Sequence, residues 1–460
     1  MSRSMSWIRR ALAVAFAVAA FATVPALAQG TEDRLKALEK EVAELRAAVA
    51  TAKSEAGAEA VAELERRLEL VAAEIEKMKL GEAAVEADQS VYGLGPAASK
   101  VYRKAKGVSI GGYGELLYQN FAGSNDAGAP SGKTDELDVL RGIVYVGYKW
   151  NDKWLLNTEL EWEHGSTGKG GEASIEFAYV DRLIRPAVNV RAGLVLVPMG
   201  LVNELHEPTV FLGARRPGIE NAILPTTWRE SGVGLFGEVG GFTYRTYLVN
   251  GLDAKGFSAG GIRGGRQQGA HAKAEDLAWV GRLDWTATPG LVAGGSLYYG
   301  DAGQGIVDPL DGATLGVTTR IAELHADWKW RGLQTRALWT DAELDDVAGL
   351  NRALLLTGNK SIGESMDGVY LEAGYDLFSR GDRRPGGTRL VPFARWESYD
   401  TQASVPAGFA RNPASDVDVL TVGIEWFPFE QVVVKGDWQD VDNGAGTGVD
   451  QINLALGWVF

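Results

Sequence analysis

The chain of 460 residues contains no cysteine. That absence excludes disulfide bonds, zinc-thiolate sites, a cysteine nucleophile and lipoprotein attachment. The sequence also lacks a basic patch large enough to neutralise many phosphates, and its net charge is −14, so no nucleic-acid partner is expected. After residue 28, no stretch reaches the roughly 20 continuous apolar residues that a membrane helix needs. The mature chain is therefore expected to have no membrane-spanning helix.

Residues 1–28 have the pattern of a secretory signal peptide. Arg9 and Arg10 close a basic start, an apolar run follows over 11–23, and Ala26-Leu27-Ala28 forms a small-x-small cleavage site. We predict that this segment directs export and is removed. The alternative is an uncleaved membrane anchor.

Residues 31–80 are rich in Ala, Glu, Leu, Lys and Arg and contain no aromatic residue. Apolar residues keep a 3-4 spacing over 35–49 and again over 64–78, which is the pattern of a coiled-coil seam. A helix with so narrow an apolar stripe can bury it by self-association. We therefore predict a short periplasmic coiled coil. The alternative is a solvated spacer. Residues 81–106, with Gly, Pro and a short basic patch, are predicted to be a linker.

From residue 107 to the C-terminus, segments of alternating apolar and polar residues follow one another in pairs. Such period-two alternation is typical of strands with one apolar face. We predict about sixteen strands, over 107–121, 136–150, 153–164, 172–184, 187–197, 231–238, 241–250, 275–287, 290–300, 316–329, 332–343, 364–378, 388–400, 416–428, 430–440 and 449–460.

The links between these strands alternate in length. Tight links such as "KWNDK", "GEVGG" and "WKWRG" alternate with long links rich in Gly, Asp, Ala and Ser. Short turns on one rim and long loops on the other describe a transmembrane β-barrel with an even number of strands. The predicted fold is therefore an all-β membrane protein, an antiparallel barrel of about sixteen strands over 107–460, preceded by a short α-helical coiled coil. A soluble sandwich would explain one alternating strand but not the aromatic residues that recur beside the turns.

The two parities of the predicted strands assign an outer and an inner face. In "WLLNTELEWEHG", residues 154–165, Trp154 and Trp162 share one parity and are expected to face lipid. The opposite parity is polar and is expected to face a water-filled lumen, since a barrel of this size is too wide for side chains to fill. Its predicted lumen-lining residues are Arg141, Arg191, Arg245, Arg282, Arg336, Arg395, Glu159, Glu161 and Glu163.

Two groups of motifs resemble a known family. The last strand, "INLALGWVF" with Trp458 and Phe460, resembles the signature that the barrel-assembly machinery of Gram-negative bacteria recognises. The run "LPTTWRESGVGLFG" at 224–237, the pair Arg216-Pro217 and "LVPFARWESYD" at 390–400 resemble the phosphate-selective porin O/P superfamily. The coiled coil ahead of the barrel is similar to that of the dicarboxylate-associated porins. The resemblance implies a homotrimeric, sixteen-stranded channel in outer-membrane lipid, with the coiled coil in the periplasm.

In that family the third long loop folds into the barrel and narrows it. The resemblance assigns this role to residues 198–230, and the candidate constriction residues are Glu204, His206, Glu207, Arg215, Arg216, Glu220 and Arg229. Arg229 and Glu230, beside a strand start, could instead be anchors that hold the loop. Selective family members use a lysine-rich constriction, whereas 198–230 contains no lysine. The resemblance therefore implies a passive pore for small polar solutes, foremost anions such as phosphate or dicarboxylates.

Two alternative functions are an outer-membrane hydrolase and a tether. An outer-membrane hydrolase would need a histidine beside a nucleophile, and the four histidines, His164, His206, His271 and His325, have no such neighbour in the sequence. "ELHE" at 204–207 has metal-ligating residue types, but at a spacing that occurs often by chance. A tether would use 31–80 to bind peptidoglycan or a periplasmic partner, with the barrel as its anchor. We assign no catalytic residue, no metal and no cofactor.

Overall fold

The structure is a computed structural model that describes residues 40, 43–44, 66, 91–379 and 387–460. The predicted signal peptide lies outside these residues. So does the predicted coiled coil, except for four helical residues, Lys40, Ala43, Glu44 and Arg66. Residues 91–460 belong to one compact unit of the chain.

Sixteen strands form the structure from residue 107 onward, as the alternation predicted. Most observed ends lie within three residues of the predicted ones, and the largest difference is the extension of one predicted strand from 400 to 404. The strands are β1 (Gly107–Phe121), β2 (Glu136–Asn151), β3 (Trp154–Glu163), β4 (Ala173–Arg185), β5 (Val188–Leu196), β6 (Arg229–Val239), β7 (Phe242–Asn250), β8 (Leu277–Trp285), β9 (Leu291–Gly300), β10 (Thr319–Trp330), β11 (Leu333–Leu344), β12 (Ser365–Tyr375), β13 (Arg389–Ser404), β14 (Asp416–Phe429), β15 (Val432–Asn443) and β16 (Gln451–Val459).

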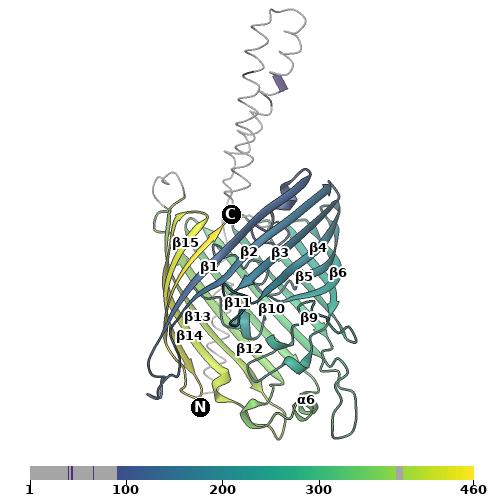
Figure 1. The fold of residues 1–460 in the computed structure, drawn as a ribbon, viewed down its shortest axis with the longest axis vertical. Coiled ribbons are helices and arrows are strands. Elements are labelled where there is room, and N and C mark those ends of the chain that lie inside the picture. The colour runs from purple at the N-terminus through teal and green to yellow at the C-terminus, as the bar shows by residue number, and fades with distance from the viewer. Residues whose placement is uncertain (1–39, 41–42, 45–65, 67–90, 380–386) are drawn as a thin grey trace, which may run out of the picture. The chain divides into compact units, whose positions relative to one another are not determined.

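The sheet closes on itself (Figure 1). Each strand pairs antiparallel with its neighbours in the chain, and β1 completes the ring by pairing with β16 from Tyr113 opposite Val459 to Phe121 opposite Gln451. A closed ring leaves no strand edge with unpaired backbone groups, which is the condition for a sheet to cross hydrocarbon. The predicted antiparallel barrel is confirmed.

The two rims of the barrel differ as predicted. One, here called the turn rim, has two-residue turns at Gly240-Gly241 and Arg331-Gly332, where both residues have positive φ. Such turns match the twist of the strands that they join, and glycine accepts this backbone without strain. The other, the loop rim, carries most of the long connections and the helix α6 (Val347–Ala353), while the turn rim has one longer connection, 376–388. The predicted pattern of short and long links is confirmed.

The outer face of the barrel is apolar. Trp154 and Trp162 of β3 are 42% and 45% exposed, whereas Glu159 and Glu161 between them are 0% and 2% exposed. The same division holds on β16, where Ile452 and Leu454 point outward. Side chains of this kind on the outside of a closed barrel face lipid. No helix among the described residues is long and apolar enough to cross a membrane.

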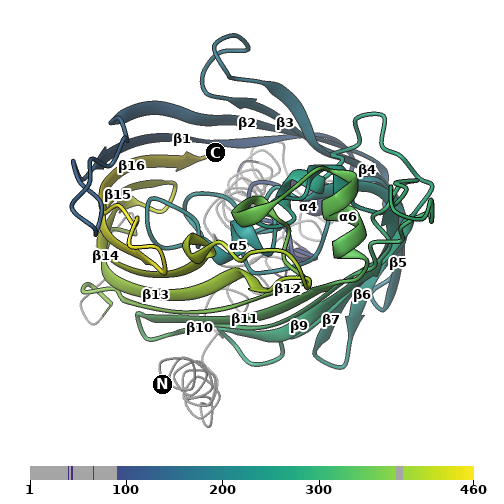
Figure 2. The same cartoon turned by 90° about the horizontal axis from the view of Figure 1, so that it is seen from below.

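The inside of the barrel holds two further elements, which Figure 2 shows within the ring of strands. One is the connection between β5 and β6, residues 197–228, here called the inward loop, which contains α5 (Ile219–Ala222). The other is residues 91–103, here called the N-terminal segment, which contains α4 (Lys100–Arg103). A large buried cluster joins apolar residues of both elements to inward aromatic residues of the strands, such as Tyr113 and Tyr145.

The wall therefore differs from the expected water-lined one. Most inward side chains of the strands are buried, including the predicted lumen residues Arg141, Arg191 and Arg395, which are at most 8% exposed. The strands alone enclose a wide space, but the two inserted elements cover the wall. The sequence alternation could not reveal this cover, because it reports only which side of the sheet a residue faces.

Candidate pore constriction

Basic side chains of the wall hold the inward loop through its carbonyl groups. Arg395 donates to the carbonyls of Leu212 at 3.0 Å and of Arg215 at 3.1 Å. Lys435 donates to the carbonyls of Phe211 at 2.7 Å and of Gly213 at 3.0 Å. Arg282 and Arg336 donate in the same way to Gly200 and Val210.

Acidic side chains of the wall hold the same loop through its amide groups. Glu425 accepts from the backbone N–H of Gly213 at 3.0 Å, and Asp437 accepts from that of Ala214 at 2.6 Å. Within the loop, Glu220 accepts from the Val202 N–H and from the Tyr370 hydroxyl, both at 2.7 Å. A buried loop must find partners for its backbone polar groups, and here charged residues of the barrel supply them.

All six predicted lumen arginines are neutralised inside the barrel. Each has at least one carboxylate within ion-pair distance and is buried. The shortest contacts are Arg141 to Glu115 at 3.0 Å, Arg191 to Asp181 at 2.9 Å, Arg245 to Asp284 at 2.7 Å, Arg282 to Asp284 at 2.9 Å, Arg336 to Asp327 at 2.9 Å and Arg395 to Glu397 at 2.8 Å. These side chains lie on the inner face of the barrel and serve as anchors there.

Four predicted constriction residues are buried within the inward loop. Glu204 pairs with Arg245 at 3.2 Å, and Glu220 is fully buried. His206 contacts Glu159 of β3 at 3.2 Å. Burial alone would lower the pKa of His206, but the Glu159 carboxylate outweighs it and holds that pKa above its ordinary value. Glu207 is 1% exposed, and burial raises its pKa to about 7.

The other predicted acids and Arg229 lie on strands. Glu161 is 3.8 Å from Arg141, and Glu163, near the loop rim, is partly exposed. Arg229, at the start of β6, lies 3.8 Å from Glu176 and donates to the Ser174 hydroxyl at 3.0 Å. Its position agrees with the anchoring role that was the alternative for this residue.

Arg215 and Arg216 differ from all of these. Arg215 is exposed and Arg216 is partly exposed, and Arg216 donates to the His206 carbonyl at 3.2 Å. Within the part of the chain that the structure describes, neither guanidinium lies within ion-pair distance of a carboxylate. Their charge is therefore available to a solute in the lumen.

Two more arginines join them from the connection between β7 and β8. Arg263 donates to the Thr226 carbonyl at 2.6 Å, and Arg266 donates to the carbonyls of Thr226 at 2.7 Å and Thr227 at 3.0 Å. These bonds tie the second connection to the inward loop. Burial, and then the neighbouring guanidinium groups of Arg266 and Arg216, lower the pKa of Arg263. Crowded cations of this kind favour a bound anion.

We call Arg215, Arg216, Arg263 and Arg266 the arginine cluster, a set defined by what its members lack; of these, Arg266 and Arg216 act electrostatically on Arg263. None of its members has a carboxylate ion pair among the described residues, in contrast to the arginines of the wall. Arg263 and Arg266 were not among the residues predicted from the sequence. The available signal was "GIRGGRQQG" at 261–269, two arginines three residues apart in a glycine-rich connection.

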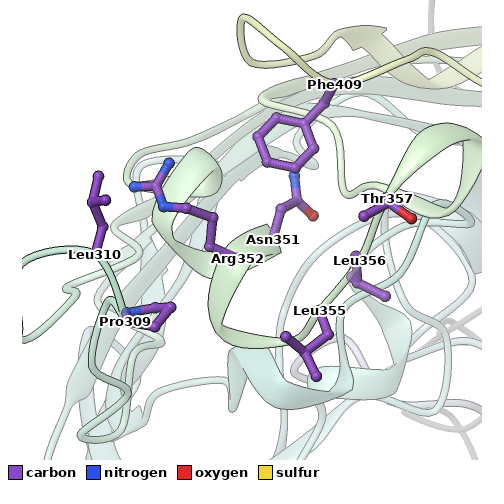
Figure 3. A pocket seen from close by; sticks show the side chains of 8 residues that line it. All are labelled: Pro309, Leu310, Asn351, Arg352, Leu355, Leu356, Thr357 and Phe409. Carbon is purple, nitrogen blue, oxygen red and sulfur yellow. The ribbon is translucent and has the colours of Figure 1, made fainter.

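A separate pocket on the loop rim is apolar (Figure 3). It has a volume of about 410 Å³ and is lined by side chains that include Leu310, Leu355 and Phe409. Arg352 in its wall is paired with Asp308. A lining of this kind does not suit a small polar solute, so this pocket is not a candidate for the path of such a solute.

The histidines of the rival hydrolase function contact acidic groups. His325 lies 2.5 Å from Glu323 and 2.9 Å from Asp284, and His164 lies 2.6 Å from Asp138. The hydroxyl of Ser296 donates to Glu323, the carboxylate that also contacts His325, at 2.5 Å. These contacts orient the histidines toward carboxylates, and the metal motif "ELHE" uses Glu204 and Glu207 in other contacts. The described residues contain no group of three or more His, Cys, Asp or Glu placed to hold a metal ion.

A closed antiparallel barrel of sixteen strands, apolar outside and charged inside, defines the class of this protein as a transmembrane β-barrel. No family model matches the chain. The chain belongs to the same family as a protein of Aquifex aeolicus (strain VF5) described as "Uncharacterized protein". The two are 36% identical over 395 residues, which cover 84% of this chain and 87% of the relative.

Solved structures with a related fold are more distant. An anion-selective porin from Comamonas acidovorans is 14% identical, with a TM-score of 0.48 over 77% of this chain and 99% of the porin. OmpF of Salmonella typhi in complex with daunomycin is 10% identical, with a TM-score of 0.48 over 77% and 98%. OmpT of Vibrio cholerae in its trimer form is 12% identical, with a TM-score of 0.46 over 78% and 100%.

Proposed function

We propose that this protein is a porin, a passive channel for small polar solutes that favours anions. The observation that carries the proposal is the arginine cluster. Wall arginines are neutralised by carboxylates at ion-pair distance, whereas Arg215, Arg216, Arg263 and Arg266 have no carboxylate within that distance among the described residues. A charged constriction in a low-dielectric wall raises the local concentration of ions of opposite sign.

Transport through such a channel needs no cofactor, no covalent step and no energy source. An anion that reaches the arginine cluster exchanges part of its hydration shell for guanidinium N–H groups, which are planar donors well matched to carboxylate and phosphate oxygens. Several weak contacts allow the anion to leave again. Phosphate and dicarboxylates, the solutes that the sequence resemblance suggests, both have this chemistry.

We propose the outer membrane of a Gram-negative bacterium as the location. Three features support it: the closed barrel, the short turns on one rim with long loops on the other, and a C-terminal Phe460 that is 52% exposed. In such membranes short turns face the periplasm, which would place the turn rim and the predicted coiled coil there. A homotrimer, implied by the sequence resemblance, completes the proposal. Light scattering of the detergent-solubilised protein tests it.

The experiment that tests the channel is conductance in planar bilayers under a KCl gradient. We expect a reversal potential of the anion-selective sign, and block of the chloride current by phosphate, sulfate or succinate. In the double variant Arg215→Gln/Arg216→Gln the selectivity should fall. The matched control is Arg320→Gln, because Arg320 is an exposed arginine at the loop rim, paired with Asp345.

Each contrary result has a distinct meaning. A cation-selective reversal potential without block would overturn the anion preference. Equal selectivity in the double variant and the wild type would remove the arginine cluster from the proposal. Negligible conductance of the intact protein would reject the porin and favour the tether function, in which the barrel serves only as an anchor.

A further inference from the structure

The N-terminal segment, residues 91–103, is packed inside the barrel although it precedes the first strand. Leu94, Ala97, Ala98, Ser99 and Val101 are each at most 4% exposed. Exposure begins abruptly at Arg103, and residues 104–106 leading into β1 are exposed as well. A linker that only connects two domains does not bury its side chains in this way. The expected linker over 81–106 thus contains, in its described part, an element of the barrel interior.

The segment has a defined internal structure. A turn at Tyr92-Gly93, where both residues have positive φ, brings Val91 opposite Leu94. The Ser99 hydroxyl donates to the Gly95 carbonyl at 2.8 Å and accepts from the Val91 N–H at 3.2 Å. Local bonds of this kind fix the conformation of a short chain without a long helix.

Two glycines make room for the segment. A Cβ atom added at Gly147 of β2 would lie 2.6 Å from Cβ of Val101, and one added at Gly95 would lie 2.4 Å from the Glu207 carboxylate. Side chains at these positions would collide with their neighbours. Close approach of this kind is what glycine permits within a strand or beside a loop.

Several polar contacts tie the segment to the wall. The Tyr102 hydroxyl donates to Asp181 at 2.6 Å and accepts from Arg191 at 2.7 Å. Asn157 donates to the Ala98 carbonyl at 2.9 Å, and Lys149 donates to the Tyr102 carbonyl at 3.2 Å. These partners come from β2, β3, β4 and β5, so the segment spans one side of the lumen.

A further contact ties the segment to the inward loop. One oxygen of the Glu207 carboxylate accepts from the backbone N–H groups of Ala97 at 3.0 Å and Ala98 at 3.3 Å. His206, the preceding residue, contacts Glu159 of β3. The inward loop is therefore held on this side by the N-terminal segment as well as by the wall.

We propose that the N-terminal segment is a resident strut of the channel, which fills the turn-rim side of the lumen along β2 to β5 and positions the inward loop. Its positioning residues are Tyr102, which holds the strut to the wall, and Glu207, which holds the loop to the strut. The claim that the strut sets the size of the channel rests on the proposed function. The claim that the strut resides in the lumen does not depend on that function.

Thiol labelling tests residence. The chain has no cysteine, so Val101→Cys in the full-length protein introduces a single thiol. The matched control is Ala105→Cys, four residues further on and exposed. With a bulky hydrophilic maleimide in detergent, we expect Val101→Cys to react about tenfold or more slowly than the control, because only rare local opening exposes it. Equal rates in the folded protein would overturn the proposal, whether or not the protein conducts.

Single-channel conductance tests the positioning role. The double variant Tyr102→Ala/Glu207→Ala removes both attachments, and circular dichroism with the thermal transition verifies that its barrel is folded. We expect a larger conductance, a weaker anion selectivity and faster labelling at Val101→Cys. The conservative variant Tyr102→Phe/Glu207→Gln, which keeps the rings and one acceptor oxygen, should recover part of the wild-type conductance. Faster labelling with unchanged conductance would show that the strut does not set the channel, and would overturn that part of the proposal.

The two proposals fail in distinguishable ways. A protein that does not conduct but protects Val101→Cys keeps the strut and loses the porin. A protein that conducts anions while Val101→Cys reacts freely keeps the porin and loses the strut.

Discussion

The arginines of the wall and those of the arginine cluster share one lumen but differ in their partners. On the wall, the strand register places a carboxylate opposite several of the arginines: Arg395 lies opposite Glu372, and Arg191 lies opposite Asp181. Arg245 and Arg282 lie opposite each other, and both pair with Asp284 of β8. Opposite charges on neighbouring strands form cross-strand pairs. Arg215, Arg216, Arg263 and Arg266 come from connections, where no register supplies such a partner. The comparison teaches that residue type alone does not distinguish the two groups of arginines, whereas the absence of an ion-paired carboxylate does, and on that absence the proposed selectivity role rests.

Removing a wall arginine should have the largest effect on stability. Arg395→Ala leaves Glu372 and Glu397 buried without their cation, and two carbonyls of the inward loop lose their donor. Breaking a buried pair in this way costs about 3–5 kcal/mol. We expect a corresponding drop in the free energy of unfolding, measured by urea titration in detergent. The control Arg320→Ala, whose pair with Asp345 is exposed, should change little. A small loss for Arg395→Ala would mean that wall and cluster arginines do not differ in role.

Neutralising the second half of the arginine cluster should change selectivity more than stability. Arg263→Gln/Arg266→Gln removes two uncompensated charges, so the reversal potential should move toward zero. Arg263→Lys/Arg266→Lys keeps the charge but loses part of the bonding to Thr226 and Thr227, and should keep the sign of the selectivity. Planar-bilayer recordings measure both. If the lysine variant behaved like the glutamine variant, the geometry of the loop rather than its charge would set the selectivity.

The barrel was predictable from the sequence because lipid and strand geometry impose a local rule. Outward residues such as Trp279 and Leu283 must be apolar, inward ones need not be, and the alternation repeats along every strand. Turns such as Gly240-Gly241 join some of the hairpins through residues that accept positive φ. All sixteen strands could therefore be located from short stretches of sequence.

The interior was not predictable in the same way, because it depends on contacts between distant residues. Ala214 meets Asp437, which is 223 residues later, and Ala97 meets Glu207, 110 residues later. No local pattern encodes such pairs. The alternation indicates an inner face for these arginines, but it could not show that carboxylates and backbone groups would occupy most of them. A useful signal was overlooked in Gly147, a glycine on an inward parity, which marks the place where Val101 approaches the sheet.

The smallest expected effect is a pH dependence of the strut, and it extends the comparison to the acids of the interior. Wall acids such as Asp181 and Glu397 are paired with arginine, whereas Glu207 is faced by the Ala97 and Ala98 amides, by His206 and Lys100, and by the like charge of Glu159. Burial raises the pKa of Glu207 to about 7 from its ordinary value of 4.5. At a pH between 4.5 and 7, Glu207 holds a proton while the strut is packed in the lumen and would lose it if the strut were released. Packing of the strut is therefore strongest below pH 4.5 and weakens as the pH rises toward 7. The raised pKa of His206 acts in the same direction, because its added stability is present below its ordinary pKa and is lost as the pH rises further.

The measurement is the labelling rate of Val101→Cys divided by that of Ala105→Cys at each pH, which cancels the intrinsic reactivity of the thiol. We expect the ratio to rise from acid to neutral pH. Glu207→Gln, which cannot ionise but keeps an acceptor oxygen, should flatten that rise, leaving only the part that His206 contributes near neutrality. If the ratio fell with rising pH, the hydrogen bonds from the strut amides to the charged Glu207 carboxylate would contribute more free energy than burial of that charge costs. Glu207 would then behave like the wall acids that are paired with arginine, and the two groups of acids would not differ.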